Sequence, residues 1–421
     1  MTRAQLDTPF LDGGIRSTNF FNGRLLSRED MQREQDAARA AHERLGRALG
    51  AGIAQGLEVE AAAIGGGSVA DPVVTVRAGL AVNRRGQTIA LDRDVDVSLL
   101  RPTAPATGGS SAAGGGFATC APPENAVYVV GTGVYLLTVS PASRTQGLAV
   151  VSGLNNTASP CNAKERVEGV QFHLYQVKLA PTELADDAHL RNAVAYKFFA
   201  AGGATTDAVR DPFGVAAAPA VLTDPAVPDC DVPLAVFQWT AAGGLRWVDL
   251  WSVRRGLSGA LDPPLGGTAH RARVGEARLR QFLDEIGQIS ATSRPTLKAG
   301  DRFAFLPPVG ALPLPASGGS PIGAFDLSTF FSGLTTRDPV VIDAARVAPL
   351  LDGSLLYPPI DLASHELIWL YYVRQNMASI AAGAADTPYV VFATGHTPYQ
   401  GNARLDLAHL DFANHSLRIG P

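Results

Sequence analysis

A capped helix followed by a change of hydrophobic period most constrains the fold of this chain. Residues 28–50 are rich in alanine, glutamate and arginine, with apolar residues near helical spacing, which predicts an α-helix. Ser27 can accept a hydrogen bond from the backbone N–H of Asp30, and Glu29 and Asp30 favour the positive end of the helix dipole. Asp30 stands where a capping box prefers glutamate, so the sequence predicts an imperfect box. From Gly56 onward the apolar residues follow a period of two, which indicates strands.

The predicted helix carries a narrow apolar stripe, which includes Ala38 and Ala41. Such a stripe is typical of a close helix–helix seam, but a surface helix lying on its own domain would show it as well. A hydrophobic staple would join Leu26 to Met31, so the aromatic pair further upstream has another role. We expect that pair to fill a socket in another subunit or a place in the chain's own core. The candidate assembly residues are Phe20, Phe21, Asn22, Gly23, Leu25, Leu26, Met31, Leu45 and Leu49.

The composition limits the classes of partner. The chain has 421 residues, of which 46% are hydrophobic and 18% charged, so it can bury more than one core. Its net charge is −4 with no block of lysine or arginine, which argues against a nucleic-acid partner. No run of eighteen apolar residues predicts a membrane span, and the N-terminus has no apolar signal core. We therefore expect synthesis and folding in the cytoplasm.

We expect a mainly β protein with α+β character, in which an N-terminal helix precedes β-rich sandwich or barrel-like domains and a mixed C-terminal domain. The predicted parts are an arm and helix at 1–57, β-rich domains at 58–260 and a mixed α/β domain at 261–421. The β-rich part includes a glycine-rich loop at 107–117. It also includes an insertion at 200–231, rich in alanine, glycine, proline and aspartate, which we expect to lie on the surface.

Further elements follow from periodicity and proline content. Residues 271–287 place apolar side chains at i, i+3, i+4 and i+7, which predicts an amphipathic helix. Residues 305–313 contain prolines that exclude a helix, and 325–331 favour a short one. The apolar run at 365–376 fits a helix or a strand. Strands are predicted at 72–77, 87–90, 95–99, 126–130, 135–139, 170–177, 234–239 and, less clearly, 403–412. Residues 78–86 are predicted to form a strand that ends in a turn closed by glycine.

The three cysteines, Cys120, Cys161 and Cys230, are widely spaced and form no C-x-x-C pair. This spacing disfavours zinc ribbons and thioredoxin-like chemistry. We expect small buried thiols, with a Cys120–Cys161 disulfide as the alternative.

The residues 19–35, NFFNGRLLSREDMQREQ, and the GLEV phrase at 56–59 resemble structural proteins of contractile phage tails and related injection particles. The resemblance continues in the blocks 78–90, 233–255 and 305–313, which occur in the same order as in that family. It implies a non-enzymatic subunit of the baseplate, fibre or spike region, without cofactors. It also implies self-association, most naturally as a trimer around the tail axis, together with other tail and baseplate proteins. A fainter likeness joins the opening helix to the trimeric adaptor of the type VI secretion baseplate.

No residue pattern predicts a catalytic, metal or cofactor site. His365-Glu366 begins like a zincin helix, but Trp369 stands in place of the second histidine ligand. The glycines at 131 and 133 lack the third glycine of a dinucleotide loop. Candidates that stay open are a cation on the alternating Asp92, Asp94 and Asp96, and a ligand set from Asp406, His409, Asp411 and His415. For each of them a solvated strand face is the favoured explanation.

Two other functions remain as alternatives. Trp239, Trp247 and Trp251 cluster within thirteen residues, which is compatible with a β-rich carbohydrate- or receptor-binding protein if their rings are exposed. An unrecognised hydrolase would depend on Asp406, His409 or Asp411.

Overall fold

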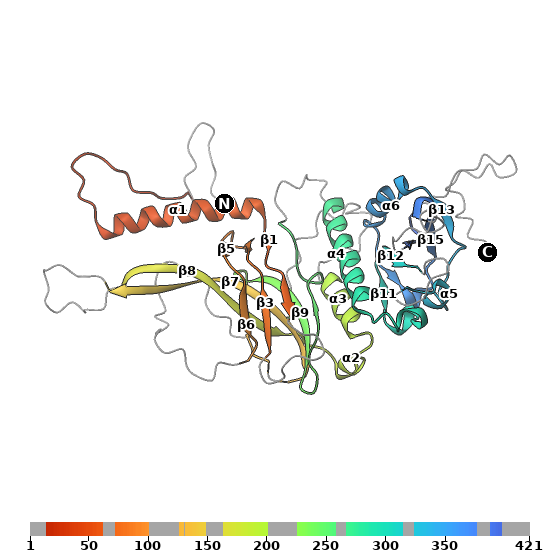
Figure 1. The fold of residues 1–421 in the computed structure, drawn as a ribbon. Coiled ribbons are helices and arrows are strands. Elements are labelled where there is room, and N and C mark those ends of the chain that lie inside the picture. The colour runs from red at the N-terminus through yellow and green to blue at the C-terminus, as the bar shows by residue number, and fades with distance from the viewer. Residues whose placement is uncertain are drawn as a thin grey trace.

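The computed structural model describes residues 14–61, 72–100, 126–129, 131–148, 163–200, 225–257, 267–314, 324–376 and 388–397. In this part of the chain the strands form five open sheets, and helices lie at both ends and between them (Figure 1). The mainly β fold with α+β character is therefore confirmed.

The N-terminal helix α1 (Arg28–Leu49) leads into two small antiparallel sheets. Between them, Leu57 adopts a left-handed conformation (φ 61°) and is fully buried, so the chain turns while the side chain stays in the core. One sheet has the order β1 (Gly52–Gly56), β4 (Gly79–Val82), β5 (Thr88–Leu91), and the other β2 (Val59–Ala61), β3 (Val73–Val76), β6 (Val95–Ser98).

A larger antiparallel sheet forms the centre of the molecule. One of its faces packs on the two small sheets, and the other packs on helix α3 (Leu190–Ala200). Its order is β10 (Gly244–Asp249), β9 (Val232–Thr240), β7 (Gly133–Leu148), β8 (Ala163–Gln176), and the short helix α2 (Pro181–Ala185) follows β8.

Strands β7 and β8 are much longer than the predicted strands at 135–139 and 170–177. Strand β9 pairs with β7 only as far as Val139, whereas the β7–β8 ladder continues to Leu148 and Ala163. Beyond Val139 the two strands therefore form a two-stranded ribbon, which projects in the same direction as α1 (Figure 1).

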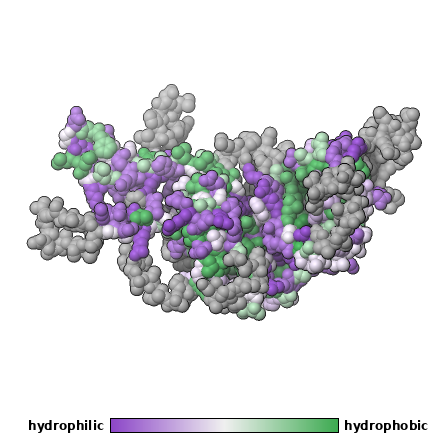
Figure 2. Space-filling view, in the orientation of Figure 1, coloured by the Kyte–Doolittle hydropathy of each residue, from purple (hydrophilic) through white to green (hydrophobic). Residues whose placement is uncertain are grey.

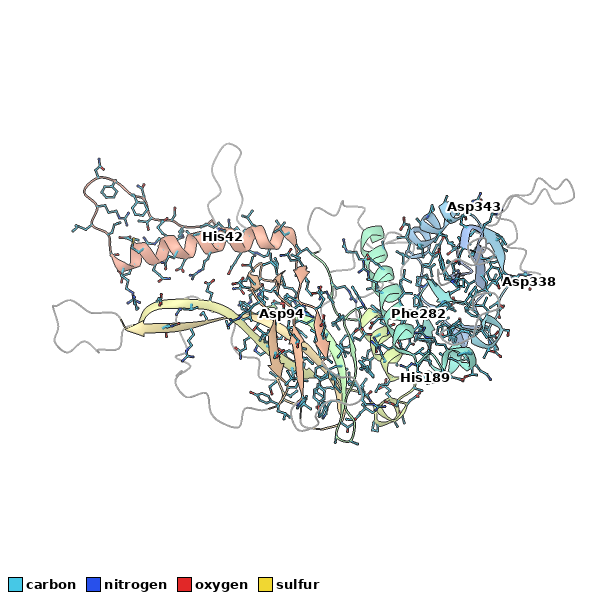
Figure 3. All side chains as sticks on the ribbon, in the orientation of Figure 1. His42, Asp94, His189, Phe282, Asp338 and Asp343 are labelled. Atoms are coloured by element: carbon cyan, nitrogen blue, oxygen red, sulfur yellow. The ribbon has the colours of Figure 1, made fainter. Side chains whose placement is uncertain are left out.

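The C-terminal part is built on helix α4 (Gly267–Gln288), which contains the predicted helix 271–287. Phe282 of α4 packs edge-on against Phe392 of a mixed sheet (Figure 3). That sheet has the order β12 (Val309–Pro313), β16 (Tyr389–Thr394), β15 (Ile368–Val373), β13 (Val340–Ile342). The remaining elements are α5 (Leu327–Phe330), α6 (Val347–Ser354) and the strand pair β11 (Phe305–Leu306) and β14 (Ile360–Asp361).

Several local predictions are confirmed. The short helix expected at 325–331 is α5, the proline-rich segment is extended, and the run at 365–376 contributes strand β15. The segment 126–130 differs, since Val127 forms only an isolated bridge to Leu174. The glycine-rich loop 107–117 and the strand predicted at 403–412 lie outside the described residues.

The prediction that 200–231 lies on the surface is wrong for its described end. Val227, Cys230 and Asp231 are buried. Asp231 accepts hydrogen bonds from Thr138 (2.6 Å) and Tyr175 (2.9 Å), so this end of the segment is held inside the central sheet. A carboxylate placed there is kept ionised by those donors and by the nearby His173 ring.

The cysteine prediction also needs correction, because Cys230 is disulfide-bonded. The chain contains two other cysteines, Cys120 and Cys161, and both lie outside the described residues. Cys230 is therefore not the free buried thiol that the spacing suggested.

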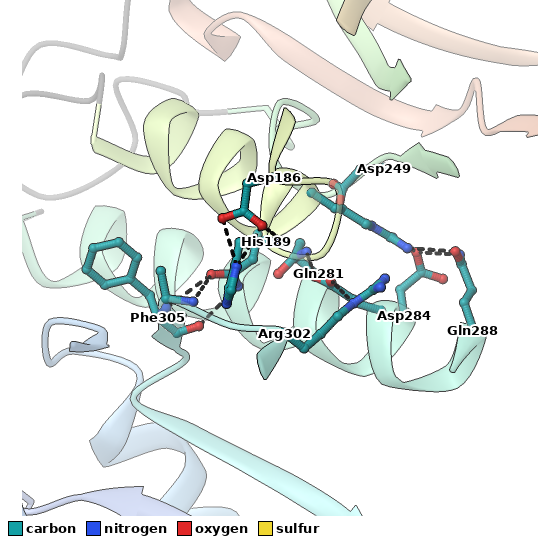
Figure 4. A network of polar contacts seen from close by, with 12 residues as sticks. Asp186, His189, Asp249, Gln281, Asp284, Gln288, Arg302 and Phe305 are labelled. Atoms are coloured by element: carbon teal, nitrogen blue, oxygen red, sulfur yellow. Dashed lines mark hydrogen bonds and ion pairs between the residues drawn. The ribbon is translucent and has the colours of Figure 1, made fainter. Parts of the chain in front are cut away.

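A buried polar network joins the central sheet to the C-terminal part (Figure 4). Arg191 of α3 is 2% exposed and contacts Asp249 of β10 (3.2 Å) and Asp284 of α4 (2.5 Å). Next to it the fully buried Glu285 accepts from Gln281 (2.8 Å) and Arg302 (3.1 Å). Because these side chains come from three elements, their charges fix how α4 sits against the sheet.

The network predicts a pH dependence of stability. Burial raises the pKa of Glu285 above 4.5, although Arg191 and Arg302 oppose the shift. The native state therefore holds this proton more tightly than the unfolded state, and stability is lost as the pH rises through the native pKa. In Glu285→Gln that loss is absent, so the unfolding free energy of the variant should rise relative to the wild type as the pH increases above 4.5.

Denaturant titrations at a series of pH values measure how the unfolding free energy changes with pH. This slope is separate from the loss of the Arg302 contact, which shifts the unfolding free energy by the same amount at every pH. Glu276→Gln is the control, because Glu276 lies on the same helix, is about half exposed and pairs with Arg280. A pH slope of Glu285→Gln equal to that of the wild type would contradict the prediction.

Candidate assembly surface

The segment 14–27, called the hook here, runs back along α1 and turns sharply before the helix begins (Figure 1). The turn is closed by a hydrogen bond from Arg24 N–H to the Phe21 carbonyl (3.2 Å). Gly23 has φ 89°, a conformation that glycine adopts at the third position of a type II turn. Asn22 and Gly23, predicted as assembly residues, therefore shape the turn that positions their apolar neighbours.

Asp30 holds the hook against the helix. Its carboxylate accepts from Arg24 (2.5 Å) and from the backbone N–H of Ser27 (3.2 Å), and its own N–H donates to Ser27 Oγ (3.2 Å). Both bonds of a capping box are thus present, so the shorter aspartate serves as well as glutamate, and the predicted imperfection is wrong. The Ser27 N–H, together with the Arg24 charge, keeps the pKa of Asp30 below its usual range.

Thr18 ties the near end of the hook to the same turn of the helix. Its hydroxyl donates to the Asp30 carbonyl (3.0 Å), and its backbone N–H donates to Glu34. The hook and the first turns of α1 therefore form a unit that needs no contact with the sheets.

This unit presents apolar side chains to solvent. Phe20 is 54% exposed, Phe21 63% and Leu25 94%, and green atoms gather at the tip of the hook in Figure 2. Leu26 and Met31 are also exposed, at 54% and 52%. The alternative that the aromatic pair fills the chain's own core is excluded, since neither ring is buried.

The apolar stripe of α1 is likewise uncovered, because Leu45 and Leu49 are at least half exposed. Helix α1 reaches the sheets near its C-terminal end, where Gly46 is buried against Gly86 of the β4–β5 turn. A Cβ on Gly46 would lie 2.0 Å from the Gly86 carbonyl oxygen, so only glycine permits this approach. Glu43 adds a hydrogen bond with Gln87 (3.2 Å).

The structure places the other candidate groups in ordinary structural roles. Asp94 accepts from Arg77 (2.6 Å) and from the Ala78 N–H (2.8 Å), and Asp96 accepts from Thr75 (2.7 Å) (Figure 3). These carboxylates line a solvated strand face. In the described ranges, no three His, Cys, Asp or Glu side chains come close enough together to hold a metal ion. The possible ligand set Asp406, His409, Asp411 and His415 lies outside those ranges.

The glycine pair and the tryptophans are also explained by packing. Gly133 begins strand β7, so no helix start is available there for a phosphate. His365 sits in a left-handed turn before β15, not on a zincin helix. Trp239 and Trp247 are 5% and 7% exposed, so these two rings are core residues and are not available for stacking on a sugar.

Comparison with known proteins adds no assignment, since no family model and no curated protein matches this chain. Among the described residues, no helix combines the length and the apolar character that crossing a bilayer requires. Of the residues that build the surface, sequence reasoning missed Thr18, Arg24 and Gly46. A glycine inside a predicted helix was the available signal for Gly46, because such a residue often marks a close backbone approach.

Proposed function

We propose that this protein is a non-enzymatic structural subunit of a phage-tail-like contractile injection particle, in its baseplate, fibre or spike region, and that it self-associates through the hook and α1. The observation that carries the proposal is the hook itself. A short segment is folded by its own hydrogen bonds so that two phenylalanines and a leucine face solvent. Such an arrangement costs hydration free energy in a lone subunit and is favourable once a second subunit covers it.

The distribution of exposed apolar side chains supports a second copy as the occupant. Hook and α1 residues account for eight of the thirteen large hydrophobic side chains found exposed in the described part of the chain. The stripe on α1 and the hook lie on one arm, which leaves the body of the molecule together with the β7–β8 ribbon. In a ring of identical subunits each arm can meet the same surface of its neighbour, which gives closed symmetry.

The resemblance of the opening motif to tail proteins supplies the setting of the proposal. In that setting the subunit is made in the bacterial cytoplasm, assembles as a trimer with other baseplate proteins, and is then carried in the particle, including particles released from the cell.

Light scattering behind a sizing column tests self-association. The wild type should elute with a mass near three times 43.9 kDa. The variant Phe20→Ser/Phe21→Ser/Leu25→Ser should elute as a monomer with an unchanged circular dichroism spectrum, because none of these side chains is in the core.

The matched control changes three exposed apolar residues elsewhere, Leu283→Ser/Val341→Ser/Leu356→Ser, and should keep the wild-type mass. A wild-type protein that stays monomeric at high concentration, or a hook variant that remains trimeric, would count against the proposal.

A further inference from the structure

A cavity of about 520 Å³ lies where strand β1, the end of α3, the turn 251–256 and helix α4 meet. Its size is in the range of small-molecule sites, and its walls combine apolar groups with charged ones. Ile53, Phe199 and Val253 supply apolar wall, and Trp251 lies beneath the guanidinium of Arg280 (4.8 Å). We call this cavity the Arg255 pocket.

The charged groups around the Arg255 pocket are predominantly cationic. Five arginines and three carboxylates are found among its described lining residues. Two of the carboxylates already form an ion pair with an arginine: Glu58 with Arg254 (3.1 Å) and Glu276 with Arg280 (2.5 Å). The third, Asp231, is directed to donors of the central sheet.

Arg255 has no such carboxylate among the described residues. Its guanidinium donates to three backbone carbonyls, those of Trp251 (2.8 Å), Arg254 (2.9 Å) and Ser252 (2.9 Å). A guanidinium carries five N–H donors, so within the described residues the Nε–H and one Nη2–H of Arg255 have no protein partner. Nε and Nη2 lie on the same edge of the guanidinium, an edge that a carboxylate can contact with both oxygens.

The surroundings of Arg255 make the binding of an anion more favourable. Arg255 lies over the ring of Phe199 (5.4 Å), and Arg278 lies over the same ring (5.7 Å). Burial and the charge of Arg278 lower the pKa of Arg255 to about 10, so the side chain is still a cation at neutral pH. The buried Nε of Arg278 has no hydrogen-bond partner either. The charge of Asp249 acts on Arg255, but this carboxylate already pairs with Arg191 (3.2 Å). Two neighbouring cations that contact no carboxylate among the described residues are costly to bury, and a bound anion would offset that cost.

We propose that the Arg255 pocket binds a small organic anion whose carboxylate is held by Arg255 and whose apolar body lies against Ile53, Phe199 and Val253. A single planar fork with two free donors matches one carboxylate. A phosphate dianion would require a second unpaired cation at the mouth, whereas Arg254 and Arg280 are already paired. This site is independent of the proposed assembly function, since it shares no residue with the hook or with α1.

Isothermal titration calorimetry with two matched probes tests the site. The probes are 1-naphthoate and its neutral isostere 1-naphthamide, which have the same apolar body. The wild type should bind the carboxylate at least about tenfold more tightly than the amide, as expected for a charge-assisted bidentate contact. In Arg255→Gln the affinity for naphthoate should fall to that for naphthamide.

A second variant avoids the core. Ala54 of β1 is exposed and lines the pocket, so Ala54→Trp should fill the mouth and abolish binding of both probes without disturbing the fold. Ala90→Trp changes an equally exposed alanine on β5 that is not part of the lining and should bind like the wild type. Equal affinity of the wild type for the two probes, no binding of naphthoate, or undiminished binding by Ala54→Trp would each overturn the proposal.

Discussion

Replacing Arg191 by methionine should destabilise the protein by about 3–5 kcal/mol, the usual cost of removing one partner from a buried ion pair. Arg191 contributes three contacts, to Asp249 (3.2 Å), Asp284 (2.5 Å) and Gln288 (2.6 Å). Although burial opposes its charge, Asp249, Glu285 and Asp284 raise the pKa of Arg191. Without this cation, Asp249 at 1% exposure would lose its compensating charge, and the fully buried Glu285 would keep only Arg302. Chemical denaturation followed by tryptophan fluorescence measures the loss.

Arg374→Met provides the comparison, because Arg374 pairs with Asp343 (3.4 Å) where both side chains are well exposed. That pair should be worth less than about 1 kcal/mol. Adding Asp249→Asn to Arg191→Met should restore part of the stability, since it removes one of the stranded charges. If Arg191→Met and Arg374→Met lose similar amounts of stability, the network does not stabilise the junction between the central sheet and α4.

Gly46→Ala should release α1 from the sheet domain and destabilise the protein by about 1–3 kcal/mol, as overpacking at a rigid contact does. The added methyl group would lie 2.0 Å from a backbone carbonyl of Gly86, which has no side chain to move aside. Hydrogen exchange should become faster in the last turns of α1 and in the turn 83–87. Helix propensity alone would make Gly46→Ala stabilising, because alanine favours a helix more than glycine does. The expected loss of stability therefore has the opposite sign.

Gly287→Ala on α4 is the matched control for that opposing effect. No heavy atom lies within 4 Å of the position where its Cβ would be, so only the propensity acts. This variant should gain about 0.5–1 kcal/mol. Unchanged exchange in α1 of Gly46→Ala would show that the two glycines do not hold the helix in place.

The elements that the sequence predicted correctly are those with a local signal. Helix α1 begins at its serine cap, and α4 follows from apolar side chains at i, i+3, i+4 and i+7. Helix α3 gave no such stripe, because it is buried on two sides: Leu190, Val194 and Phe198 face the central sheet, while Ala195, Tyr196 and Phe199 face α4. A helix that is buried on two sides has apolar residues all around it, so its sequence lacks the one-sided apolar pattern from which a helix is predicted.

The sequence drew attention to the residues of the hook, but it did not reveal how the hook is folded. The exposed phenylalanines belong to a recognisable sequence motif. Their orientation, however, depends on hydrogen bonds that Asp30 accepts in the folded chain. The network at Arg191 and the Arg255 pocket were out of reach of sequence reasoning. Many of the groups that meet there are far apart in the chain, as Arg191 and Asp249 are, with a sequence separation of 58.

The contact between Gly46 and Gly86 also acts as a pivot. Arg28 lies eighteen residues before Gly46, which on an α-helix corresponds to about 27 Å. Over that length a rotation of about 10° at the glycines moves the tip of the helix by about 5 Å. In the proposed ring, leverage of this kind would let one small adjustment near the sheet set the spacing between neighbouring arms. The tolerance of such a ring would then be decided at two residues that have no side chain.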